Sequence, residues 1–442
     1  MRAVVAQVVI LAGLFASPAS AQKPGGLARR ADWQARVSEP GSGPWAEVVS
    51  VEPGSAAARA GLRAGDRITR MDGVRVDSPS RFGDARRASR AGVPVRLSVT
   101  RGRRSLPITF APRAVPLESE PGLEIVYDAV TGRLGRQRVI ITRPARATGK
   151  LPSLILVPWL SCSSVEVLGR PADGMNRLLA GILRESGFLT MRVERPGVGD
   201  SQGACSRADL AAEMAGERAA LARLQAHPSF DPDRLFVVGM SLGGGRAPLL
   251  ASGVKVRGFV SVVGVVKTWF EHMMEIERRR LVLSGKPPAE VNRAMRGYAT
   301  LYAEYLNRGK TPGRVVRENP RLAPLWEDEP AHQYGRPAAY YQQVQALDLE
   351  AAWHGVSAPT LIVAGDYDWI MSQDDHDRIA ELVNRNRPGA ATLVRWPRAS
   401  HELKQYRSRK AAFDDEGGTF DDALIARVVG WMKQQARARR TQ

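Results

Sequence analysis

One serine of this 442-residue chain occupies a setting suited to nucleophilic attack. The motif Gly239-Met240-Ser241-Leu242-Gly243 follows the apolar, β-rich run 235–238 and precedes a run of small and apolar residues, 242–252. A strand, a sharp turn and a helix in this order present a serine hydroxyl above the edge of a sheet, and small flanking residues permit the strained turn. We therefore predict that Ser241 is a nucleophile. The alternative is an ordinary glycine-rich turn between a strand and a helix.

A base and an acid for this serine can be sought after two later strand-like runs. A serine hydroxyl is a weak nucleophile until a neighbouring base, usually a histidine oriented by a carboxylate, takes its proton. The apolar run 361–364 is followed by Asp366 and Asp368, and the run 391–394 is followed by His401. These three residues are therefore candidates for the acid and the base.

The strand-like and helical segments around these candidate residues predict an α/β fold. Strands that are apolar throughout are buried on both faces, which indicates a mostly parallel sheet covered by helices. Amphipathic helical spacing at 209–226, between two such runs, fits this arrangement. The continuous apolar runs are 154–157, 189–193, 235–238, 259–263 and 361–364.

With these landmarks in order, residues 120–436 resemble the α/β-hydrolase superfamily, whose R-G-x-G-x-S-x-G loop is similar to residues 195–203. The resemblance implies a mostly parallel eight-stranded sheet with a helical cap. It also implies the chain order serine, acid, histidine, which selects His401 as the base. In the superfamily a G-x-x-D pattern with an apolar residue soon after carries the acid, which selects Asp368. Asp366 is the alternative, and one of the two aspartates is expected to cap the following helix.

The resemblance also implies where the oxyanion of a tetrahedral intermediate would be bound. Acyl transfer needs backbone N–H groups aimed at that oxygen. One donor is expected from Leu242, directly after the nucleophile, and the other from Trp159 or Leu160 in the loop after the third strand. The chain lacks the H-G-G-G form of this loop, so the sequence leaves the second donor open. No metal-ligand spacing, phosphate-binding loop or dinucleotide fingerprint occurs, and we expect neither a metal nor a cofactor.

A long insertion, from about 267 to 349, separates the sixth strand from the acid strand. It is rich in aromatic, methionine and arginine residues with helical spacing, which predicts a cap over the active site. Trp269, Phe270 and Met273 are candidates to line an acyl pocket. Core packing inside the cap is the favoured alternative for these three residues.

Residues 22–115 predict a separate small domain of short strands and tight turns, ahead of a hydrolase domain at 116–440. The segment 45–110 resembles a PDZ domain of the bacterial protease-associated kind. Such domains add an extended peptide, often a C-terminus, as a strand at an open sheet edge. Gly41, Ser42 and Gly43 are placed where the carboxylate-binding loop would lie, although they depart from a G-L-G-F signature; an unused groove is an equal alternative. The matching residues are Val48, Val51, Ser55, Ala60-Gly61-Leu62, Gly65-Asp66, Ile68 and Asp72-Gly73.

The N-terminus predicts export. Arg2, an apolar run from 4 to 15 and small residues ending Ala19-Ser20-Ala21 are typical of a cleavable signal peptide at 1–21. The apolar run is shorter than the roughly 20 residues that a membrane-spanning helix needs. We therefore expect a periplasmic or secreted protein.

The charge balance is strongly basic, with 64 basic and 45 acidic residues and a formal net charge of +19. Because most of the basic residues are arginines scattered singly, we expect no nucleic-acid partner. Peripheral attraction to anionic surfaces stays open. Residues 22–117 hold 18 basic and 8 acidic residues, which favours acidic peptides or surfaces as partners. Solvated arginines without a specific role are the alternative.

Cys162 and Cys205 are the two cysteines of the chain. In an oxidising compartment an even pair is expected to be bridged. In the fold that the chain resembles, the strands before these cysteines lie side by side. The resemblance therefore implies a disulfide that anchors the loop carrying Trp159 and Leu160.

These observations favour an exported serine hydrolase that cleaves carboxylic ester or thioester bonds through an acyl-enzyme on Ser241. One alternative is a serine peptidase acting on peptides held by the PDZ domain. Another is a non-enzymatic PDZ adaptor with a degenerate hydrolase scaffold. Because this fold hosts esterases, peptidases and lipases, it does not choose between a small ester and a peptide as substrate.

Overall fold

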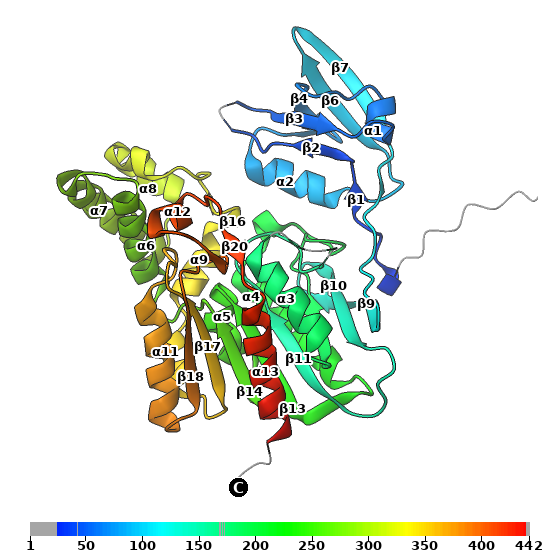
Figure 1. Ribbon diagram of the computed structural model, residues 1–442. Helices are drawn as coiled ribbons and strands as arrows, with labels where there is room; N and C mark the ends of the chain where they lie inside the picture. The colour runs from blue at the N-terminus through cyan, green and yellow to red at the C-terminus, as the bar shows by residue number, and fades with distance from the viewer. Residues whose placement is uncertain (1–23, 42, 168, 170, 172, 439–442) are drawn as a thin grey trace, which may run out of the picture.

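The computed structural model describes residues 24–41, 43–167, 169, 171 and 173–438, which form a large α/β unit and a smaller β-rich unit (Figure 1). The predicted signal peptide, residues 1–21, lies outside the described residues. None of the described helices is long and apolar enough to cross a membrane.

The large unit is built on an eight-stranded sheet with the order β18-β17-β14-β13-β11-β12-β10-β9. Neighbouring strands are parallel from β18 to β12, and β10 and β9 continue the sheet antiparallel. The mostly parallel eight-stranded sheet predicted from the sequence is thus confirmed. The strands are β9 (Leu123–Gly132), β10 (Gly135–Pro144), β11 (Leu151–Val157), β12 (Leu189–Val193), β13 (Phe230–Met240), β14 (Gly258–Val262), β17 (Thr360–Gly365) and β18 (Ala391–Trp396).

Helices cover both faces of this sheet, which is why β12, β14 and β17 are buried at every position. Side chains alternate between the faces along each strand: Leu154 and Leu156 join one buried cluster, and Ile155 and Val157 join the other. The first cluster packs under α3 (Gly174–Glu185) and α13 (Ala423–Arg437). The second packs under α4 (Leu210–Gln225), α5 (Leu242–Leu250) and α11 (Gln373–Asn386).

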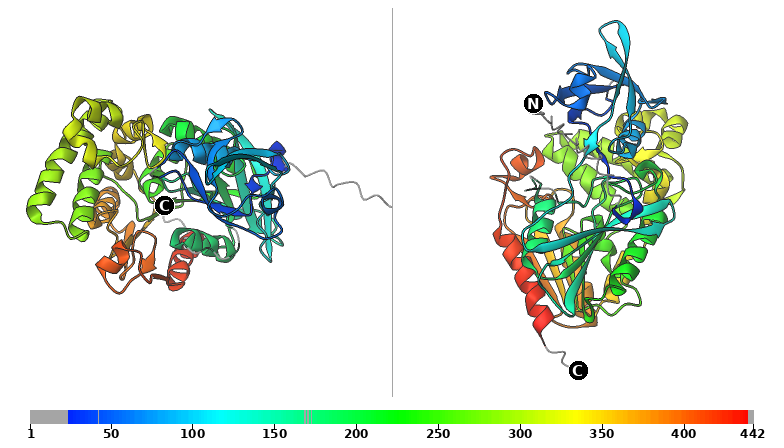
Figure 2. Two further views of the ribbon diagram at one scale, coloured as in Figure 1. Left: turned by 90° about the horizontal axis from the view of Figure 1, so that it is seen from above. Right: turned by 90° about the vertical axis from the view of Figure 1, so that its right-hand side faces the viewer.

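The predicted cap is a helical insertion between β14 and β17. Its helices join the buried cluster on the α4 face of the sheet, through residues such as Met273, Tyr305 and Tyr341. The cap and the small unit lie at the same end of the large sheet (Figures 1 and 2). The cap helices are α6 (Trp269–Leu283), α7 (Pro288–Tyr302), α8 (Pro312–Glu318), α9 (Ala338–Gln345) and α10 (Leu349–His354).

The small unit is a strongly curved sheet with two helices packed on it. Its sheet has the order β2-β3-β4-β6-β7, with β5 paired to β4. The turn between β4 and β5 is a two-residue hairpin at Asp72-Gly73, one of the pairs that match the PDZ pattern, and both residues have positive φ (47° and 82°). The elements are β2 (Ala35–Val37), β3 (Ala46–Val51), α1 (Ala56–Arg59), β4 (Arg67–Met71), β5 (Val74–Arg75), α2 (Pro79–Ala88), β6 (Val95–Arg101) and β7 (Arg104–Phe110).

The two units are joined by buried charges as well as by the chain. Arg29, which precedes the small sheet, forms ion pairs with Glu166 at 2.6 Å and with Asp200 at 3.1 Å, and all three side chains are buried. At a second contact the backbone N–H and the hydroxyl of Ser80 in α2 donate to the cap residue Glu329, each at 2.6 Å. Helix α2 therefore lies against the hydrolase unit and its cap.

Candidate active site

Ser241 stands in a strained turn between β13 and α5. Its backbone has φ 54° and ψ −127°, a conformation that side-chain-bearing residues rarely adopt. A Cβ at Gly239 would lie 2.3 Å from the carbonyl oxygen of Gly243, and a Cβ at Gly243 would lie 2.1 Å from that of Val157. Because only glycine fits at either position, the two glycines of the motif are what allow the turn to form.

Ser241, His401 and Asp368 form one hydrogen-bonded chain. The His401 Nε2 atom lies 3.0 Å from Oγ of Ser241, and Nδ1 lies 2.9 Å from Oδ2 of Asp368. All three side chains are buried. They follow β13, β17 and β18, and the C-terminal ends of parallel strands meet at one edge of a sheet, so the fold brings together residues 160 positions apart.

The two candidate acids have different surroundings. The other carboxylate oxygen of Asp368 accepts hydrogen bonds from the backbone N–H groups of Ile370 at 2.8 Å and Met371 at 2.9 Å. These bonds hold the carboxylate so that its Oδ2 atom faces Nδ1 of His401. Asp366 is only half-buried and donates its backbone N–H to Trp396. The acid that contacts His401 is therefore Asp368.

The two charged partners shift each other's pKa in opposite directions. Burial alone would raise the pKa of Asp368, but the charge and hydrogen bond of His401 outweigh it and hold the pKa below its ordinary value. Burial would lower the pKa of His401, yet the charge and hydrogen bond of Asp368 raise it above its ordinary value. The pair thus favours a protonated His401 beside an ionised Asp368, which is the state formed when the histidine takes a proton from serine.

The three predicted oxyanion donors surround the same space as Ser241. Leu242, Trp159 and Leu160 all line one cavity with the serine hydroxyl. Their backbone N–H groups form no hydrogen bond with any other described residue. Leu242 opens helix α5, and the first N–H groups of a helix have no acceptor within it, which suits them to bind an anionic oxygen.

This cavity has a volume of about 520 Å³ and a mainly apolar wall. Trp269 of the cap lines it, whereas Met273 packs in the core with its Sγ against Gln333 and Phe270 packs on the same core from outside. Of the three cap residues proposed for an acyl pocket, the structure therefore brings one to the site. Among the described residues of the wall there is no lysine or arginine.

His272 is a polar group of the cap that the sequence did not single out for this site. It lines the cavity and is buried, and its ring lies 4.7 Å from that of Trp269. Burial lowers its pKa to about 4, so the ring is neutral at neutral pH. The Nδ1 atom has no hydrogen-bond partner among the described residues.

Two carboxylates, Asp173 and Glu402, also line the cavity. Asp173 also caps α3, accepting from the backbone N–H of Asn176 at 2.8 Å. Desolvation and the charge of Asp173 raise the pKa of Glu402, against the opposing charges of His401 and Lys404. The sequence signal for these residues was weak, because they come from the start of a helix and from the position after the histidine rather than from a motif.

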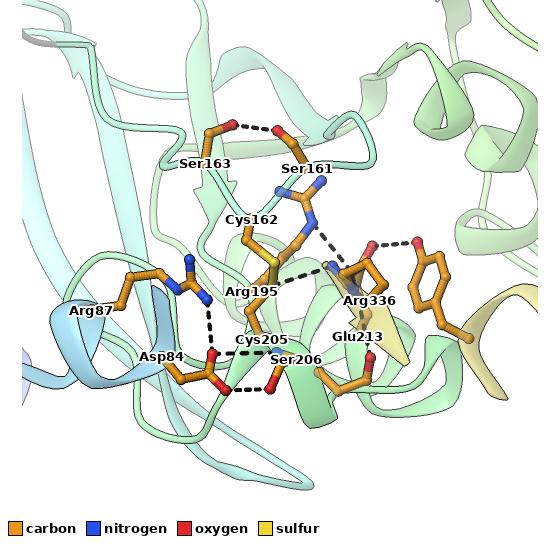
Figure 3. Close-up of a disulfide and its surroundings, with 12 residues drawn as sticks. Asp84, Arg87, Ser161, Cys162, Ser163, Arg195, Cys205, Ser206, Glu213 and Arg336 are labelled. Atoms are coloured by element: carbon orange, nitrogen blue, oxygen red, sulfur yellow. Dashed lines mark hydrogen bonds and ion pairs between the residues drawn. A yellow bond between two sulfur atoms is a disulfide. The ribbon is translucent and has the colours of Figure 1, made fainter. Parts of the chain in front are cut away.

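The predicted disulfide between Cys162 and Cys205 is present, with Cα atoms 6.1 Å apart. It ties the loop after β11 to the turn at Cys205–Arg207 (Figure 3). Within the loop, Trp159 Nε1 donates to Oγ of Ser163 at 2.7 Å. On the other side of the bridge, the N–H and hydroxyl of Ser206 both donate to Asp84 of α2 in the small unit. The disulfide therefore lies between the small unit and the loop that holds the expected oxyanion donors.

A buried ionic cluster around Glu213 lies beside the Cys162–Cys205 disulfide (Figure 3). The Glu213 carboxylate pairs with Arg336 at 2.6 Å, Arg246 at 2.9 Å and Arg195 at 3.2 Å. Burial would raise the pKa of Glu213, but the three guanidinium charges lower it to about 2. Arg195 comes from the loop that resembles R-G-x-G-x-S-x-G, and Arg336 comes from the cap. Glu213 lies in α4 and Arg246 in α5, so the cluster joins the cap, these two helices and the loop through charges that a motif search does not reveal.

The remaining predicted residues lie away from this cavity. Gly41 and Gly43 are in the loop between β2 and β3 of the small unit, and Ser42 lies outside the described residues. Among the described residues, no group of three or more histidine, cysteine or acidic side chains is arranged to hold a metal ion.

Comparison with known families finds two matches along the chain. A model described as a PDZ domain matches residues 47–101, and a model described as serine aminopeptidase, S33, matches residues 172–405. Both matches lie where the sequence motifs predicted them. No curated protein matches the chain.

Several solved structures are similar to the chain at low sequence identity. The esterase of Pyrobaculum calidifontis is 16% identical, with 73% of this chain and 88% of that chain covered and a TM-score of 0.40. Carboxyl esterase 2 of Tuber melanosporum is 15% identical, with 73% and 90% covered and a TM-score of 0.43. Est1E of Butyrivibrio proteoclasticus is 14% identical, with 71% and 99% covered and a TM-score of 0.44.

Proposed function

The chain belongs to the serine aminopeptidase (S33) family of α/β-hydrolases, and from that premise we propose that it hydrolyses carboxylic ester or thioester bonds through an acyl-enzyme on Ser241. The observation that carries this proposal is the hydrogen-bonded chain from Ser241 through His401 to Asp368. In a non-enzymatic adaptor with a degenerate hydrolase scaffold, nothing would require a nucleophile, a base and an acid to be hydrogen-bonded to one another in this order.

The reaction follows from this geometry. His401 accepts the hydroxyl proton of Ser241 as Oγ attacks the carbonyl carbon, and Asp368 stabilises the imidazolium. The oxygen of the tetrahedral intermediate is bound by the N–H of Leu242 and by that of Trp159 or Leu160. His401 then gives its proton to the leaving alcohol or thiol, and the carbonyl re-forms as an ester to Ser241. Water activated by His401 hydrolyses this acyl-enzyme and restores the serine.

The wall of the cavity supports a substrate with an apolar acyl group. Trp159, Trp269 and Trp369 line it, and a cavity of about 520 Å³ has room for a medium-sized acyl chain. His272 gives the cap a neutral polar group at the same wall, which we propose hydrogen-bonds the substrate.

A panel of p-nitrophenyl esters of increasing acyl length, with thioester counterparts, tests this proposal. We expect turnover of medium-length esters by the wild-type protein, with no detectable turnover in Ser241→Ala. A folded wild-type protein that cleaves none of the esters or thioesters would contradict the proposal.

The second candidate is a peptidase that acts at a free amino terminus. The observation that favours it is the pair of carboxylates, Asp173 and Glu402, on a wall without lysine or arginine, because such a pair would hold an ammonium group near the scissile carbonyl. Aminoacyl p-nitroanilides and their N-acetylated forms distinguish the two functions. Faster cleavage of the free-amine anilides than of any ester would favour the peptidase, and loss of this preference in Glu402→Gln would assign the pair.

We also propose that the protein is exported to a periplasm or beyond the cell. The leader-like residues 1–21 and the Cys162–Cys205 bridge support this location, because disulfides persist in oxidising compartments. Its net charge of +19 would then favour peripheral contact with anionic surfaces. N-terminal sequencing of the protein from cell fractions tests export: a mature terminus at Gln22 outside the cytosol is expected, and an intact Met1 confined to the cytosol would contradict it.

A further inference from the structure

A second, smaller cavity lies mostly within the cap, beside the catalytic cavity. It has a volume of about 220 Å³ and is lined by residues of α6, of α7 and of the segment from the short helix η4 (Pro320–Leu325) to residue 328. Three residues line both cavities: Ile276 of α6, Tyr334 in a two-residue turn, and Trp369, which follows β17. We call this second cavity the side pocket, and it adjoins the space in which an ester would meet Ser241.

Helix α6 runs along both cavities. His272 and Ile276 line the catalytic cavity, and Ile276, Glu277 and Arg280 line the side pocket. Because an α-helix rises about 1.5 Å per residue, His272 and Arg280 lie about 12 Å apart along the helix axis. A substrate group that is several bonds away from the scissile carbonyl would therefore reach the side pocket.

Aromatic rings form much of the wall of the side pocket. The rings of Tyr298 and Tyr302 are stacked with their centres 5.8 Å apart, and Trp326 meets Tyr302 edge-on at 6.4 Å. Trp369 is held from behind by Phe413, whose ring centre lies 5.0 Å away. Aromatic rings attract one another in such offset and edge-to-face arrangements, at about 4.5 to 7 Å between centres. A further ring in the side pocket would therefore find partners for its faces and its edges. The aromatic residues of the wall are Tyr298, Tyr302, Trp326, Tyr334 and Trp369.

The charged groups of this wall already have partners within the protein or lie in solvent. The buried carboxylate of Glu277 accepts from Nε of Arg280 at 2.8 Å and from the hydroxyl of Tyr302 at 3.2 Å. Asp328 accepts hydrogen bonds from two backbone N–H groups, and Glu327 is exposed. Since Glu277 and Arg280 neutralise each other, the pocket needs no charge from a ligand, which favours an uncharged group.

We propose that the side pocket binds an uncharged aromatic ring of the substrate, placed several bonds from the scissile carbonyl. This inference rests on the proposed ester or thioester hydrolysis at Ser241 and names a substrate class for it: esters that carry an aryl-alkyl group. A ring is favoured over a straight alkyl chain because the five aromatic side chains of the wall make specific contacts with a ring. It is favoured over a cationic group because Arg280 adds its own positive charge to the wall and Glu277 is paired with it.

Hydrolysis of matched esters, followed in a pH-stat, tests this site. The first set holds the methyl esters of phenylpropanoic, cyclohexylpropanoic and nonanoic acids, whose acyl groups have equal numbers of carbon atoms. The second set places the same three groups on the alcohol side, as acetates. We expect the phenyl compound to exceed the other two in kcat/KM by about threefold or more in one of the sets. The set that shows the preference identifies whether the acyl group or the alcohol carries the ring.

Variants at Leu325 connect this preference to the side pocket. Leu325 is half-buried and lines the side pocket without lining the catalytic cavity. Leu325→Trp fills the pocket and should lower kcat/KM for the preferred phenyl ester, relative to methyl butanoate with the same variant, by about tenfold. Leu325→Ala enlarges the pocket and should raise the ratio of naphthyl to phenyl ester, a gain that partial misfolding would not produce. This second variant decides the matter if Leu325→Trp does not fold.

Val282→Trp is the matched control. Val282 lies on α6, is exposed and lines neither cavity, so the same large side chain should leave the ratio of phenyl ester to methyl butanoate unchanged. The methyl ester of a trimethylammonio-alkanoic acid is a further probe, because a wall of aromatic rings can also hold a quaternary ammonium group.

Three results would overturn the inference. They are equal kcat/KM for the phenyl, cyclohexyl and linear esters in both sets, a preference for the trimethylammonio ester over the phenyl esters, and selectivity that neither Leu325 variant changes. A wild-type protein that cleaves linear esters without preferring a ring contradicts this inference alone. A folded protein that cleaves no ester or thioester contradicts the proposed function, and the inference fails with it.

Discussion

The catalytic cavity and the cavity between the two units, which is lined by Val37 and Arg86 among others, share Ser163 of the disulfide loop. They differ in whether their polar groups are already positioned to meet a ligand. In the catalytic cavity the proposed nucleophile, base and acid already contact one another: Ser241 lies within hydrogen-bond distance of His401, and His401 within hydrogen-bond distance of Asp368. In the cavity between the units, Arg86 of the PDZ module covers the outer edge of β2 by donating to the carbonyls of Ala35 and Val37. The charges differ too, because the first wall carries two carboxylates and no lysine or arginine, whereas the second carries three arginines and one carboxylate, Glu39.

The two cavities therefore differ in whether a side chain must move before a ligand can bind. The catalytic side chains are held by strand ends, a strained turn and backbone N–H groups, so a small ester needs no rearrangement to react. The outer edge of β2 is instead covered by the long side chain of Arg86, which would have to move before another group could bind the carbonyls of Ala35 and Val37. Substitutions in the cavity between the units should therefore leave the hydrolysis of small substrates unchanged, provided that they do not alter the loop that carries Cys162 and Ser163.

The largest expected effect is the loss of the nucleophile or base. Ser241→Ala and His401→Ala should each lower kcat by about 10⁶-fold, and the double variant should fall little further because the two residues act as a unit. His354→Ala, at an exposed histidine outside the cavity, is the control and should keep wild-type activity. Steady-state kinetics on the best ester measures this, with circular dichroism to show that each variant folds. A Ser241→Ala protein with more than residual activity would move the nucleophile elsewhere.

The next largest effect separates the two aspartates. Asp368→Asn should lower kcat by about 10⁴-fold, because His401 loses the group that sets its tautomer and stabilises its charge. Asp366→Asn should change kcat by less than about threefold, since its carboxylate contacts no catalytic group. The reverse ranking would assign the acid to Asp366.

The same variant should shift the pH profile in a direction that follows from the charges. Attack requires a neutral His401, and Asp368 raises its pKa, so activity of the wild-type protein should fall as pH drops through a value above the ordinary histidine pKa of about 6.5. Removing the negative charge in Asp368→Asn lowers the pKa of His401, and the acid limb of kcat/KM should move to lower pH. A limb that does not move would show that another group titrates there.

A smaller effect, on stability and rate together, is expected from the disulfide. Closing a loop of 43 residues should stabilise the fold by about 4 kcal/mol in the chain-entropy model. The Cys162→Ser, Cys205→Ser double variant should therefore unfold at lower urea concentration, and kcat should fall because Trp159 is held less firmly. Reduction of the wild-type protein under native conditions is the matched comparison. Unchanged stability and kcat would mean that the bridge does not support the loop.

The smallest effect concerns the contact between the units. Asp84→Asn weakens the bonds from Ser206 and the pair with Arg87, and should lower the free energy of unfolding by about 1 kcal/mol. Asp77→Asn is the control, since Asp77 pairs with Arg81 inside the module alone. Urea unfolding of both variants measures the difference. Equal loss in the two would mean that the contact at Ser206 adds nothing to stability.

The catalytic side chains could be predicted because their positions follow from strand order. Ser241, Asp368 and His401 each come soon after an apolar run, and a parallel sheet gathers such positions at one edge. The choice between Asp366 and Asp368 rested on a resemblance, because a sequence does not show which carboxylate two backbone N–H groups will hold. The disulfide was predictable for the same reason as the triad.

Other features depend on side-chain directions that a sequence does not display. Trp269 and Met273 are four residues apart on one helix and both pack in the core, yet only Trp269 also lines the cavity. The position of Arg86 against the carbonyls of Ala35 and Val37 depends on the packing of α2 beside β2. The predicted loop at Gly41–Gly43 was argued from position alone.

The central claim, that Ser241 is an activated nucleophile, is tested most directly by a fluorophosphonate probe followed by mass spectrometry of the digested protein. We predict that one probe molecule attaches to the peptide containing Ser241, that attachment abolishes ester hydrolysis, and that Asp368→Asn slows labelling strongly while Asp366→Asn does not. Folded wild-type protein that hydrolyses the esters but carries no probe on Ser241 would contradict the account.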